Sequence, residues 1–255
     1  MQLAPEPERR IAVVGACGGI GAAVVAALLE ARCAVAALDL PVSLERAPPP
    51  EGVSVVQPVD GRDAESVSAA FAALAGHWDA IDGLVVASGF AGPRQPLADT
   101  PVDAIDEVIA GNLRLTALVL QAAAPLIMRG ADAAAVLLSS DMAYAPQPGY
   151  APYVAAKAGI VALGRSVARE WAPGVRVNIV SPGAVDTPFL RGGMGRADVL
   201  DAPLRFDMAA YLAQVPLGRL ALAADIVGPV LFLLGPASRY LTAEVIHVSG
   251  GAVMA

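Results

Sequence analysis

The segment from Ile11 to Leu40, IAVVGACGGIGAAVVAALLEARCAVAALDL, constrains the fold more than any other part of this chain. An apolar run, a glycine cluster, a helical pattern of apolar residues and a second apolar run predict strand, turn, helix and strand. Gly15, Gly19 and Gly21 would let the backbone approach a pyrophosphate at the helix N-terminus, where free N–H groups and the helix dipole favour anions. The segment therefore predicts a dinucleotide-binding βαβ unit.

An acidic residue, Asp39, closes the second predicted strand about 20 residues after the glycine turn, as dinucleotide-binding units require. Its carboxylate can accept hydrogen bonds from both ribose hydroxyls of an adenosine and would repel a 2′-phosphate. The next residues are Leu40 and Pro41, so no arginine follows immediately to compensate. This pattern favours NAD over NADP.

Short apolar strands alternate with amphipathic helices along the chain, without a sequence repeat or a domain boundary. We expect strands near 10–15, 33–39, 53–57, 82–87, 133–139, 175–180 and 243–248, and helices near 19–31, 63–77, 101–129, 151–171 and 223–234. The alternation predicts an α/β fold, a Rossmann-like doubly wound parallel sheet with helices on both faces, in a single domain spanning 1–255. Pro125 is expected to bend the end of the long third helix. The proline-rich stretch 41–52 is expected to be a connection.

A second pattern lies in SSDMAYAPQPGYAPYVAAKAGIVAL, where Pro152 suits a helix start. Tyr153 and Lys157 are four residues apart and should share a helix face. An ammonium beside the phenol would favour the phenolate and bring proton exchange closer to neutral pH. Ser140 ends the apolar run AAAVLLSS, typical of a buried strand, so its hydroxyl is expected where that strand meets the site. Alone, such a tyrosine and lysine could be a packed ring and a solvated amine; the glycine turn is the independent signal.

These segments together resemble the short-chain dehydrogenase/reductase family over nearly the whole chain. The family's glycine motif matches Gly15 to Gly21, and its Ser–Tyr–Lys triad matches Ser140, Tyr153 and Lys157. Asp60, Pro182–Gly183, Thr187 and the terminal VSGG of residues 248–251 match further family positions. The resemblance implies an oxidoreductase that transfers a hydride between NAD(H) and a secondary alcohol or its ketone, assembled as a dimer or tetramer.

The resemblance also implies a role for each catalytic position. Tyr153 would exchange the substrate proton, Lys157 would lower the tyrosine pKa and hold the nicotinamide ribose, and Ser140 would hydrogen-bond the carbonyl oxygen. Asn112, in the preceding long helix, would hold a water that links Lys157 to solvent. The alternative for Asn112 is an interior asparagine that bonds the helix backbone.

Several cofactor contacts follow from the same resemblance. Asp60 would meet the adenine amino group, or would cap the helix near residue 63, and Thr187 would bind the nicotinamide carboxamide beside the Val185 backbone. Gly18 stands where NADP-binding relatives often have a basic residue. The complete expected cofactor site is Gly15, Gly18, Gly19, Ile20, Gly21, Asp39, Leu40, Asp60, Gly61, Ser88, Gly89, Tyr153, Lys157, Pro182, Gly183, Val185 and Thr187.

The chain departs from the family pattern after the fourth strand, where Val86-Ala87-Ser88-Gly89 replaces the usual Asn-Asn-Ala-Gly. The missing asparagine normally braces the central sheet, so a different local hydrogen-bond arrangement is expected. Two smaller departures are Val14, where threonine is usual, and Ser249, where aspartate is usual.

The segment 187–220 corresponds to the mobile lid over the substrate in this family, and its glycines suit hinges. Arg191, Arg196 and Arg205 could recognise an anionic group, or they could be solvated or paired with Asp198, Asp201 and Asp207. The remaining candidate pocket residues lie in loops: Phe90, Arg94, Met142, Tyr144 and Tyr150.

Charge and composition argue against other classes of protein. A net charge of −7 disfavours nucleic acid, which needs a basic face, and no apolar run reaches the roughly 18 uncharged residues of a membrane span. Neither Cys17 and Cys33 nor His77 and His247 form a metal-ligand pattern, so no metal is expected. The opening MQLAPEPERR is unlike a signal peptide, and we expect a cytoplasmic protein.

Two alternative functions remain open from the sequence. One is an NADPH-dependent 3-oxoacyl-type ketoreductase with an acyl-carrier-protein partner, against which Asp39 argues. The other is a non-catalytic dinucleotide-binding regulator, against which the intact Ser140, Tyr153 and Lys157 argue.

Overall fold

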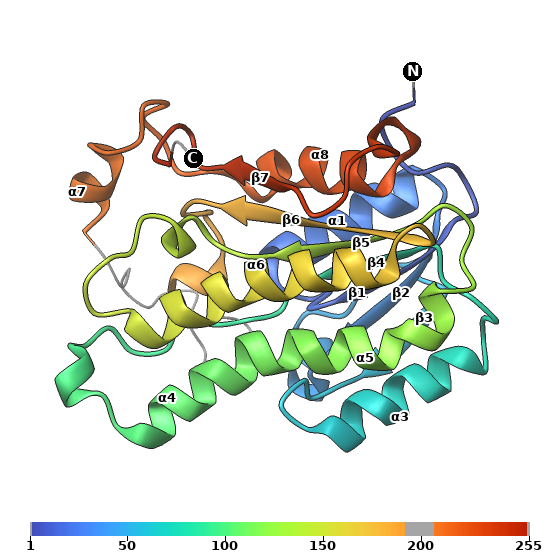
Figure 1. Cartoon of the computed structure of the whole chain (residues 1–255), viewed down its shortest axis with the longest axis horizontal. Coiled ribbons are helices and arrows are strands. Elements are labelled where there is room, and N and C mark those ends of the chain that lie inside the picture. The colour runs from blue at the N-terminus through green and yellow to red at the C-terminus, as the bar shows by residue number, and fades with distance from the viewer. Residues whose placement is uncertain (1, 192–206, 254–255) are drawn as a thin grey trace.

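A single parallel sheet forms the centre of the computed structural model, which describes residues 2–191 and 207–253 (Figure 1). Its strands are β1 Arg10–Val14, β2 Ala34–Asp39, β3 Val55–Pro58, β4 Gly83–Val86, β5 Ala133–Leu138, β6 Val175–Pro182 and β7 Val245–Val248. They lie in the order β3-β2-β1-β4-β5-β6-β7, and every pair is parallel. The order reverses between β1 and β4, where a doubly wound sheet opens a crevice at its carboxyl edge. The predicted Rossmann-like fold is confirmed.

Helices cover both faces of the sheet (Figure 1). They are α1 Gly19–Glu30, α2 Pro41–Arg46, α3 Ala64–Ala75, α4 Val102–Ile109, α5 Leu115–Ile127, α6 Ala151–Trp171, α7 Met208–Leu212 and α8 Ala223–Leu234. Alternate strand residues face opposite sides: Ile11 and Val13 pack with α1 and α8, whereas Ala12 and Val14 pack with α3 and α5. This alternation explains the continuous apolar runs of the strands, because both faces are covered.

Two elements differ from the sequence-based prediction. The stretch 41–52 contains the short helix α2, which begins at Pro41; a proline is suited to the first helical position, and the prolines that follow Ala47 cannot continue the helix. The long third helix is interrupted by a π turn, Ala110–Arg114, between α4 and α5. Pro125 lies inside the last turn of α5, which ends at Ile127.

The predicted lid is described only at its two ends. A 3₁₀ turn, Pro188–Arg191, follows the β6 loop, and α7 precedes the return to the sheet. Asp207 caps α7 by accepting a hydrogen bond from the Ala210 N–H at 3.1 Å. Arg196 and Arg205 lie outside the described residues.

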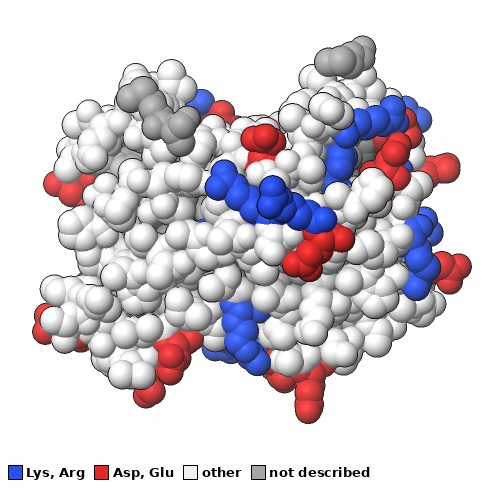
Figure 2. Space-filling model, in the orientation of Figure 1, with Lys and Arg blue, Asp and Glu red and all other residues white. Residues whose placement is uncertain are grey.

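One helical run, Val102–Ile127, is long and apolar enough to cross a membrane by length and composition. In this structure its Val119, Ala123 and Leu126 are buried in the core beneath the sheet. On the face shown in Figure 2, acidic and basic side chains are interspersed over a largely uncharged surface.

The buried Asp82 joins the start of β4 to its two neighbouring strands. Its Oδ2 accepts hydrogen bonds from the Arg10 N–H at 2.9 Å and from Arg10 Nε at 3.4 Å, and its Oδ1 accepts one from the Ala131 N–H at 3.1 Å. Burial acts to raise the pKa of Asp82, but the hydrogen bonds from Arg10 and Ala131 outweigh it and hold the pKa below its usual value. The ionised carboxylate therefore stabilises the fold.

Asp82→Ala should lower the free energy of unfolding by about 1–3 kcal/mol, because it leaves the partly buried Arg10 and Ala131 N–H groups without an acceptor. The lowered pKa means that this stabilisation is present above the pKa of the unfolded chain, about 4, and is lost as the pH falls through the folded-state value. Urea unfolding at several pH values would measure both effects. The exposed Asp79→Ala is the matched control; an equal loss in both variants would contradict this role.

Candidate active site

A cavity of about 820 Å³ lies at the carboxyl edge of the sheet, over the point where the strand order reverses. Every residue of the expected cofactor site lines this cavity, from Gly15 to Thr187. Ser140, Tyr153 and Lys157 line it as well. The structure therefore brings the glycine turn and the Ser–Tyr–Lys group, which are far apart in sequence, to one hollow.

The glycine turn has no room for side chains at three positions. Gly15 has a φ of +86°, which favours glycine, and a Cβ added there would lie 2.7 Å from the Ser88 N and Oγ atoms. A Cβ on Gly19 would lie 2.6 Å from Thr187 Cβ, and one on Gly21 would collide with the Gly15 carbonyl. Gly18 caps α1 without a side-chain hydrogen bond, so the first N–H groups of the helix remain available to an anion.

Asp39 ties the end of β2 to the glycine turn. Its Oδ2 accepts a hydrogen bond from the Cys17 N–H at 2.8 Å and its Oδ1 accepts one from the Leu40 N–H at 2.7 Å. Burial, and then the neighbouring Asp39, raise the pKa of the Cys17 thiol to about 12, so this thiol stays protonated. Asp39 is thus held by the backbone at the cavity wall.

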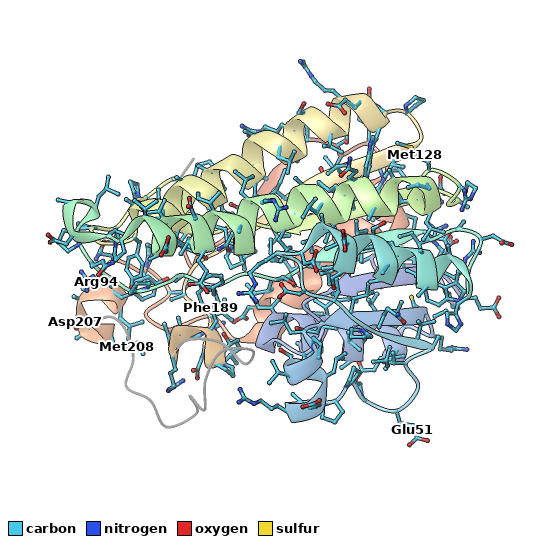
Figure 3. The ribbon with its side chains drawn as sticks, turned by 90° about the horizontal axis from the view of Figure 1, so that it is seen from below. Glu51, Arg94, Met128, Phe189, Asp207 and Met208 are labelled. Carbon is cyan, nitrogen blue, oxygen red and sulfur yellow. The ribbon has the colours of Figure 1, made fainter. Side chains whose placement is uncertain are left out.

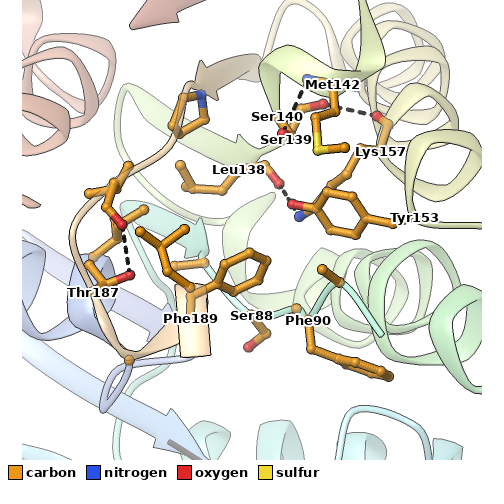
Figure 4. A pocket seen from close by; sticks show the side chains of 18 of the residues that line it. Ser88, Phe90, Leu138, Ser139, Ser140, Met142, Tyr153, Lys157, Thr187 and Phe189 are labelled. Atoms are coloured by element: carbon orange, nitrogen blue, oxygen red, sulfur yellow. Dashed lines mark hydrogen bonds between the residues drawn. The ribbon is translucent and has the colours of Figure 1, made fainter. Parts of the chain in front are cut away.

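Tyr153 and Lys157 lie one turn apart on α6, and Ser140 follows β5 (Figure 4). The two α6 side chains are 5% and 4% exposed, although both border the cavity. Lys157 Nζ donates a hydrogen bond to the Leu138 carbonyl at 2.9 Å and lies 5.7 Å from the centre of the Tyr153 ring. The Ser139 hydroxyl donates to the Lys157 carbonyl at 2.9 Å, which fixes α6 to the end of β5.

Burial controls the protonation of this group. It raises the pKa of Tyr153, against a hydrogen bond with Ser140 that lowers it, and the carboxylate of Asp141 raises it further. Burial also lowers the pKa of Lys157 to about 8. The expectation that Lys157 pulls the tyrosine pKa down is not met in this structure, because desolvation of the phenolate dominates and Nζ is bound to Leu138.

Asn112 lies within the π turn, behind Gly89. Its Nδ2 donates to the Phe90 and Val108 carbonyls at 2.8 and 2.9 Å, and Thr116 Oγ1 donates to the Asn112 carbonyl at 2.8 Å. Asn112 Oδ1 is buried and has no hydrogen-bond partner among the described residues. A Cβ on Gly89 would contact this Oδ1 and lie 3.3 Å from Lys157 Nζ, so both groups border the same glycine.

Asp60 forms an ion pair with Arg62, which the sequence did not predict. The Arg62 guanidinium donates to both carboxylate oxygens, at 3.0 and 2.7 Å, and both residues line the cavity. The alternative role of Asp60 as a helix cap is wrong, because Asp63 caps α3 by accepting from the Glu65 N–H at 2.9 Å.

Four of the expected substrate residues line the cavity: Phe90, Arg94, Met142 and Tyr150. Tyr144 does not; its ring meets the His247 ring edge-on, with centres 4.5 Å apart. Arg191 does not line it either and lies 4.0 Å from Asp186. Among residues 2–191 and 207–253, Arg62 and Arg94 are the arginines of this lining.

The cavity lining also includes residues that the sequence did not predict, among them Asp141 beside Ser140, Phe189 in the 3₁₀ turn, and Asp207 and Tyr211 at α7. Phe189 lies 6.0 Å from the Tyr153 ring, centre to centre. Asp207 is at the same end of the molecule as Arg94 (Figure 3). Asp141 could have been found from its position next to a strand-ending serine, whereas no local pattern marks the other three.

Comparison with known proteins agrees with this geometry. A family model described as “Enoyl-(Acyl carrier protein) reductase” matches residues 15–253. The “Cis-4-hydroxycyclohexanecarboxylate dehydrogenase” of Sinomonas cyclohexanicum is 34% identical over 249 residues, 96% of each chain. The 3-oxoacyl-[acyl-carrier-protein] reductase FabG of Staphylococcus aureus (strain Mu50 / ATCC 700699) is 39% identical over 150 residues, 58% of this chain and 57% of the relative.

A solved Brucella melitensis structure, described as a short-chain dehydrogenase/reductase SDR:Glucose/ribitol dehydrogenase, has a TM-score of 0.82 at 28% identity and covers 100% of both chains. The doubly wound sheet and its glycine turn are typical of proteins that bind a dinucleotide. More particularly, the chain belongs to the short-chain dehydrogenase/reductase family. It is an oxidoreductase that acts on alcohols or ketones, and members of its family bind a nicotinamide dinucleotide.

Gly21→Ala should weaken NADH binding at least tenfold, because the added methyl group takes the place of the Gly15 carbonyl and displaces the turn. A fluorescence titration with NADH measures the affinity. The control is Gly18→Ala, whose Cβ would make an ordinary 3.4 Å contact with the Gly15 carbonyl and should leave the thermal unfolding midpoint unchanged. Undiminished NADH affinity in Gly21→Ala would show that the turn does not need this glycine.

Proposed function

We propose that this protein transfers a hydride between NAD(H) and a secondary alcohol or its ketone, with Tyr153 as the general acid and base. The observation that carries the proposal is the convergence of Ser140, Tyr153 and Lys157 on the cavity that the glycine turn also lines. Such a convergence has no use in a protein that only binds a dinucleotide, so the non-catalytic alternative is less well supported.

The end of the cavity that is lined by the glycine turn fits a dinucleotide. Gly15, Gly19 and Gly21 leave the backbone bare, and the uncapped start of α1 offers N–H groups to a pyrophosphate. Asp39 would accept hydrogen bonds from the hydroxyls of the adenosine ribose. Thr187, with the Val185 backbone, would hold the nicotinamide carboxamide. When bound, the nicotinamide accepts or supplies the hydride.

Tyr153 handles the proton of the reacting oxygen. Because burial raises its pKa, the phenol holds its proton at neutral pH and is ready to protonate a forming alkoxide during ketone reduction. Ser140, whose hydroxyl donates to Asp141 Oδ1 at 3.3 Å in this structure, would exchange that hydrogen bond for one to the same oxygen as its charge changes. In the oxidative direction Tyr153 would have to release its proton, a step that its raised pKa disfavours in this structure.

Lys157 and Asn112 would form a relay that carries the Tyr153 proton toward solvent. With a pKa near 8, Lys157 exchanges protons close to neutral pH more readily than an exposed lysine would. Its Nζ and the unpartnered Oδ1 of Asn112 border Gly89 together, and a water held between them would complete the relay.

Asp39 supports NAD as the cofactor. Its carboxylate is fixed by the Cys17 and Leu40 N–H groups, so it cannot easily swing away from a 2′-phosphate. Among the described residues, Arg62 and Arg94 are the arginines of the cavity lining, and the Arg62 guanidinium is already bound by Asp60. The partial similarity to the 3-oxoacyl reductase keeps the NADPH-dependent alternative as the competing outcome.

We further propose a cytoplasmic dimer or tetramer, on the basis of the family resemblance and the 56% hydrophobic composition. Light scattering of the purified chain would measure its mass in solution, for which a monomer would be about 25.8 kDa.

Tyr153→Phe should reduce turnover by roughly 10²–10⁴-fold, the usual contribution of a general acid or base, while NADH binding is retained. Turnover is measured on a panel of secondary alcohols and their ketones, and binding by fluorescence. Tyr144→Phe is the matched control, since the Tyr144 hydroxyl has no partner in the structure and lies outside the cavity lining. Near-normal turnover of Tyr153→Phe would refute the assignment.

Asp39→Asn should shift the preference from NADH toward NADPH by at least tenfold, because it removes the charge that repels a 2′-phosphate and retains an acceptor for the Cys17 N–H. Parallel titrations with the two cofactors give the affinity ratio. If the wild type binds NADPH more tightly than NADH, the NADPH-dependent ketoreductase replaces the present proposal.

A further inference from the structure

Asp141 is a buried carboxylate on the wall of the active-site cavity, and no step of the proposed mechanism uses it. It follows Ser140 directly, is 8% exposed and lines the cavity. Within residues 2–191 and 207–253, no lysine or arginine forms an ion pair with it. A buried charge without a countercharge costs free energy. Such a group in a native structure is therefore expected to bind a partner or to have a functional role.

Backbone groups and the Ser140 hydroxyl close the turn that carries Asp141. The turn after β5 is closed by the Asp141 carbonyl, which accepts hydrogen bonds from the Tyr144 and Ala145 N–H groups at 2.9 Å each. The Ser140 hydroxyl caps the same turn by accepting from the Met142 N–H at 3.3 Å. Among residues 2–191 and 207–253, the Asp141 carboxylate receives hydrogen bonds from its immediate neighbours, the Ser140 hydroxyl at 3.3 Å and the Met142 N–H.

The Oδ2 atom of Asp141 lies near the β6 loop, and both line the cavity. A Cβ on Gly183 would be 3.3 Å from Asp141 Oδ2 and 2.8 Å from the Tyr211 hydroxyl, so both oxygens border this glycine of the β6 loop. Tyr211 reaches this point from α7, where its hydroxyl accepts a hydrogen bond from the Ala184 N–H at 2.8 Å. Ser140, which would bind the reacting oxygen, is the neighbouring residue on the other side.

We propose that Asp141 is a specificity-determining residue that accepts a hydrogen bond from a second hydroxyl on the substrate, on the carbon next to the reacting one. The inference rests on the proposed function and names its substrate class: vicinal diols and the corresponding hydroxyketones. A carboxylate only accepts hydrogen bonds, so a substrate hydroxyl satisfies it, whereas an alkyl group desolvates it without compensation and a substrate carboxylate repels it.

The electrostatics of the group agree with this role. Burial raises the pKa of Asp141 to about 6, so at about pH 8 the side chain is ionised and acts as an acceptor. Its charge in turn raises the pKa of Tyr153 and of Tyr211, which shows that the three groups share one environment. A site built to bind a hydroxyl discriminates strongly against the analogue that lacks it, because its polar group is then left unpaired.

The test compares cyclohexane-1,2-diol, cyclohexanol and 2-hydroxycyclohexanecarboxylate as substrates of the wild type, Asp141→Asn and Asp141→Ala at about pH 8. The wild type should show a kcat/KM for the diol at least tenfold above that for cyclohexanol, with the hydroxy acid lowest. In Asp141→Ala the ratio of diol to cyclohexanol should fall to about one, while kcat/KM for cyclohexanol is unchanged or higher. Asp207→Asn, which alters another carboxylate of the cavity lining, should keep the wild-type ratio.

A binding measurement separates this inference from the proposed function. Calorimetry of the NADH-loaded protein with the diol and with cyclohexanol should show tighter diol binding in the wild type and equal binding in Asp141→Ala. The variants should unfold at the wild-type temperature or above it, because a buried charge has been removed. A ratio that is the same in the wild type and Asp141→Ala, in turnover or in binding, overturns the role of Asp141. A wild type that binds the diol selectively but oxidises no alcohol supports the Asp141 role and refutes the proposed function.

Discussion

The contact between α1 and the Gly15 carbonyl is the constraint on which the rest of the site depends. Because Gly21 has no side chain, the first turn of α1 packs directly on the backbone of the β1 loop. The carboxylate of Asp39 then holds that loop through the Cys17 N–H. The Asp39 carboxylate thus holds the turn. In the proposed function the same carboxylate would also bind the adenosine ribose. One side chain would then determine both the geometry of the loop and the preference for the cofactor.

Desolvation has opposite effects on the two titratable groups of α6. It raises the pKa of Tyr153 and lowers that of Lys157, because in each case the buried charged form is disfavoured. The pKa values of Tyr153 and Lys157 are therefore set by burial. They are not set by the attraction between phenolate and ammonium that the helical spacing suggests. The phenol rests protonated beside Ser140, and the lysine is held by the Leu138 carbonyl. A molecule that enters the cavity and excludes water would change the desolvation of both side chains, and therefore both pKa values.

The sheet and most of the helices could be predicted from local periodicity, and the glycine turn from its glycine spacing. The rest of the expected cavity lining, as far as Thr187, came from the family resemblance. It did not predict α2, since the prolines near residue 48 suggested a connection and obscured a proline-initiated turn. Tyr144 was misplaced because sequence cannot tell which side of a loop faces the cavity, and it packs on His247 instead. Asp60 and Arg62 were not paired because their contact depends on side-chain conformation.

The π turn at Asn112 is supported from within the chain. Such turns contain an extra residue and leave α-helical carbonyls without their normal donors. Here the Asn112 side chain donates to the Val108 carbonyl and Thr116 to the Asn112 carbonyl. These two hydrogen bonds support the wide turn from within the chain, and Asn112 Oδ1 has no hydrogen-bond partner among the described residues. In the proposed proton relay, a turn supported in this way would present the Asn112 oxygen without a rearrangement of the helix.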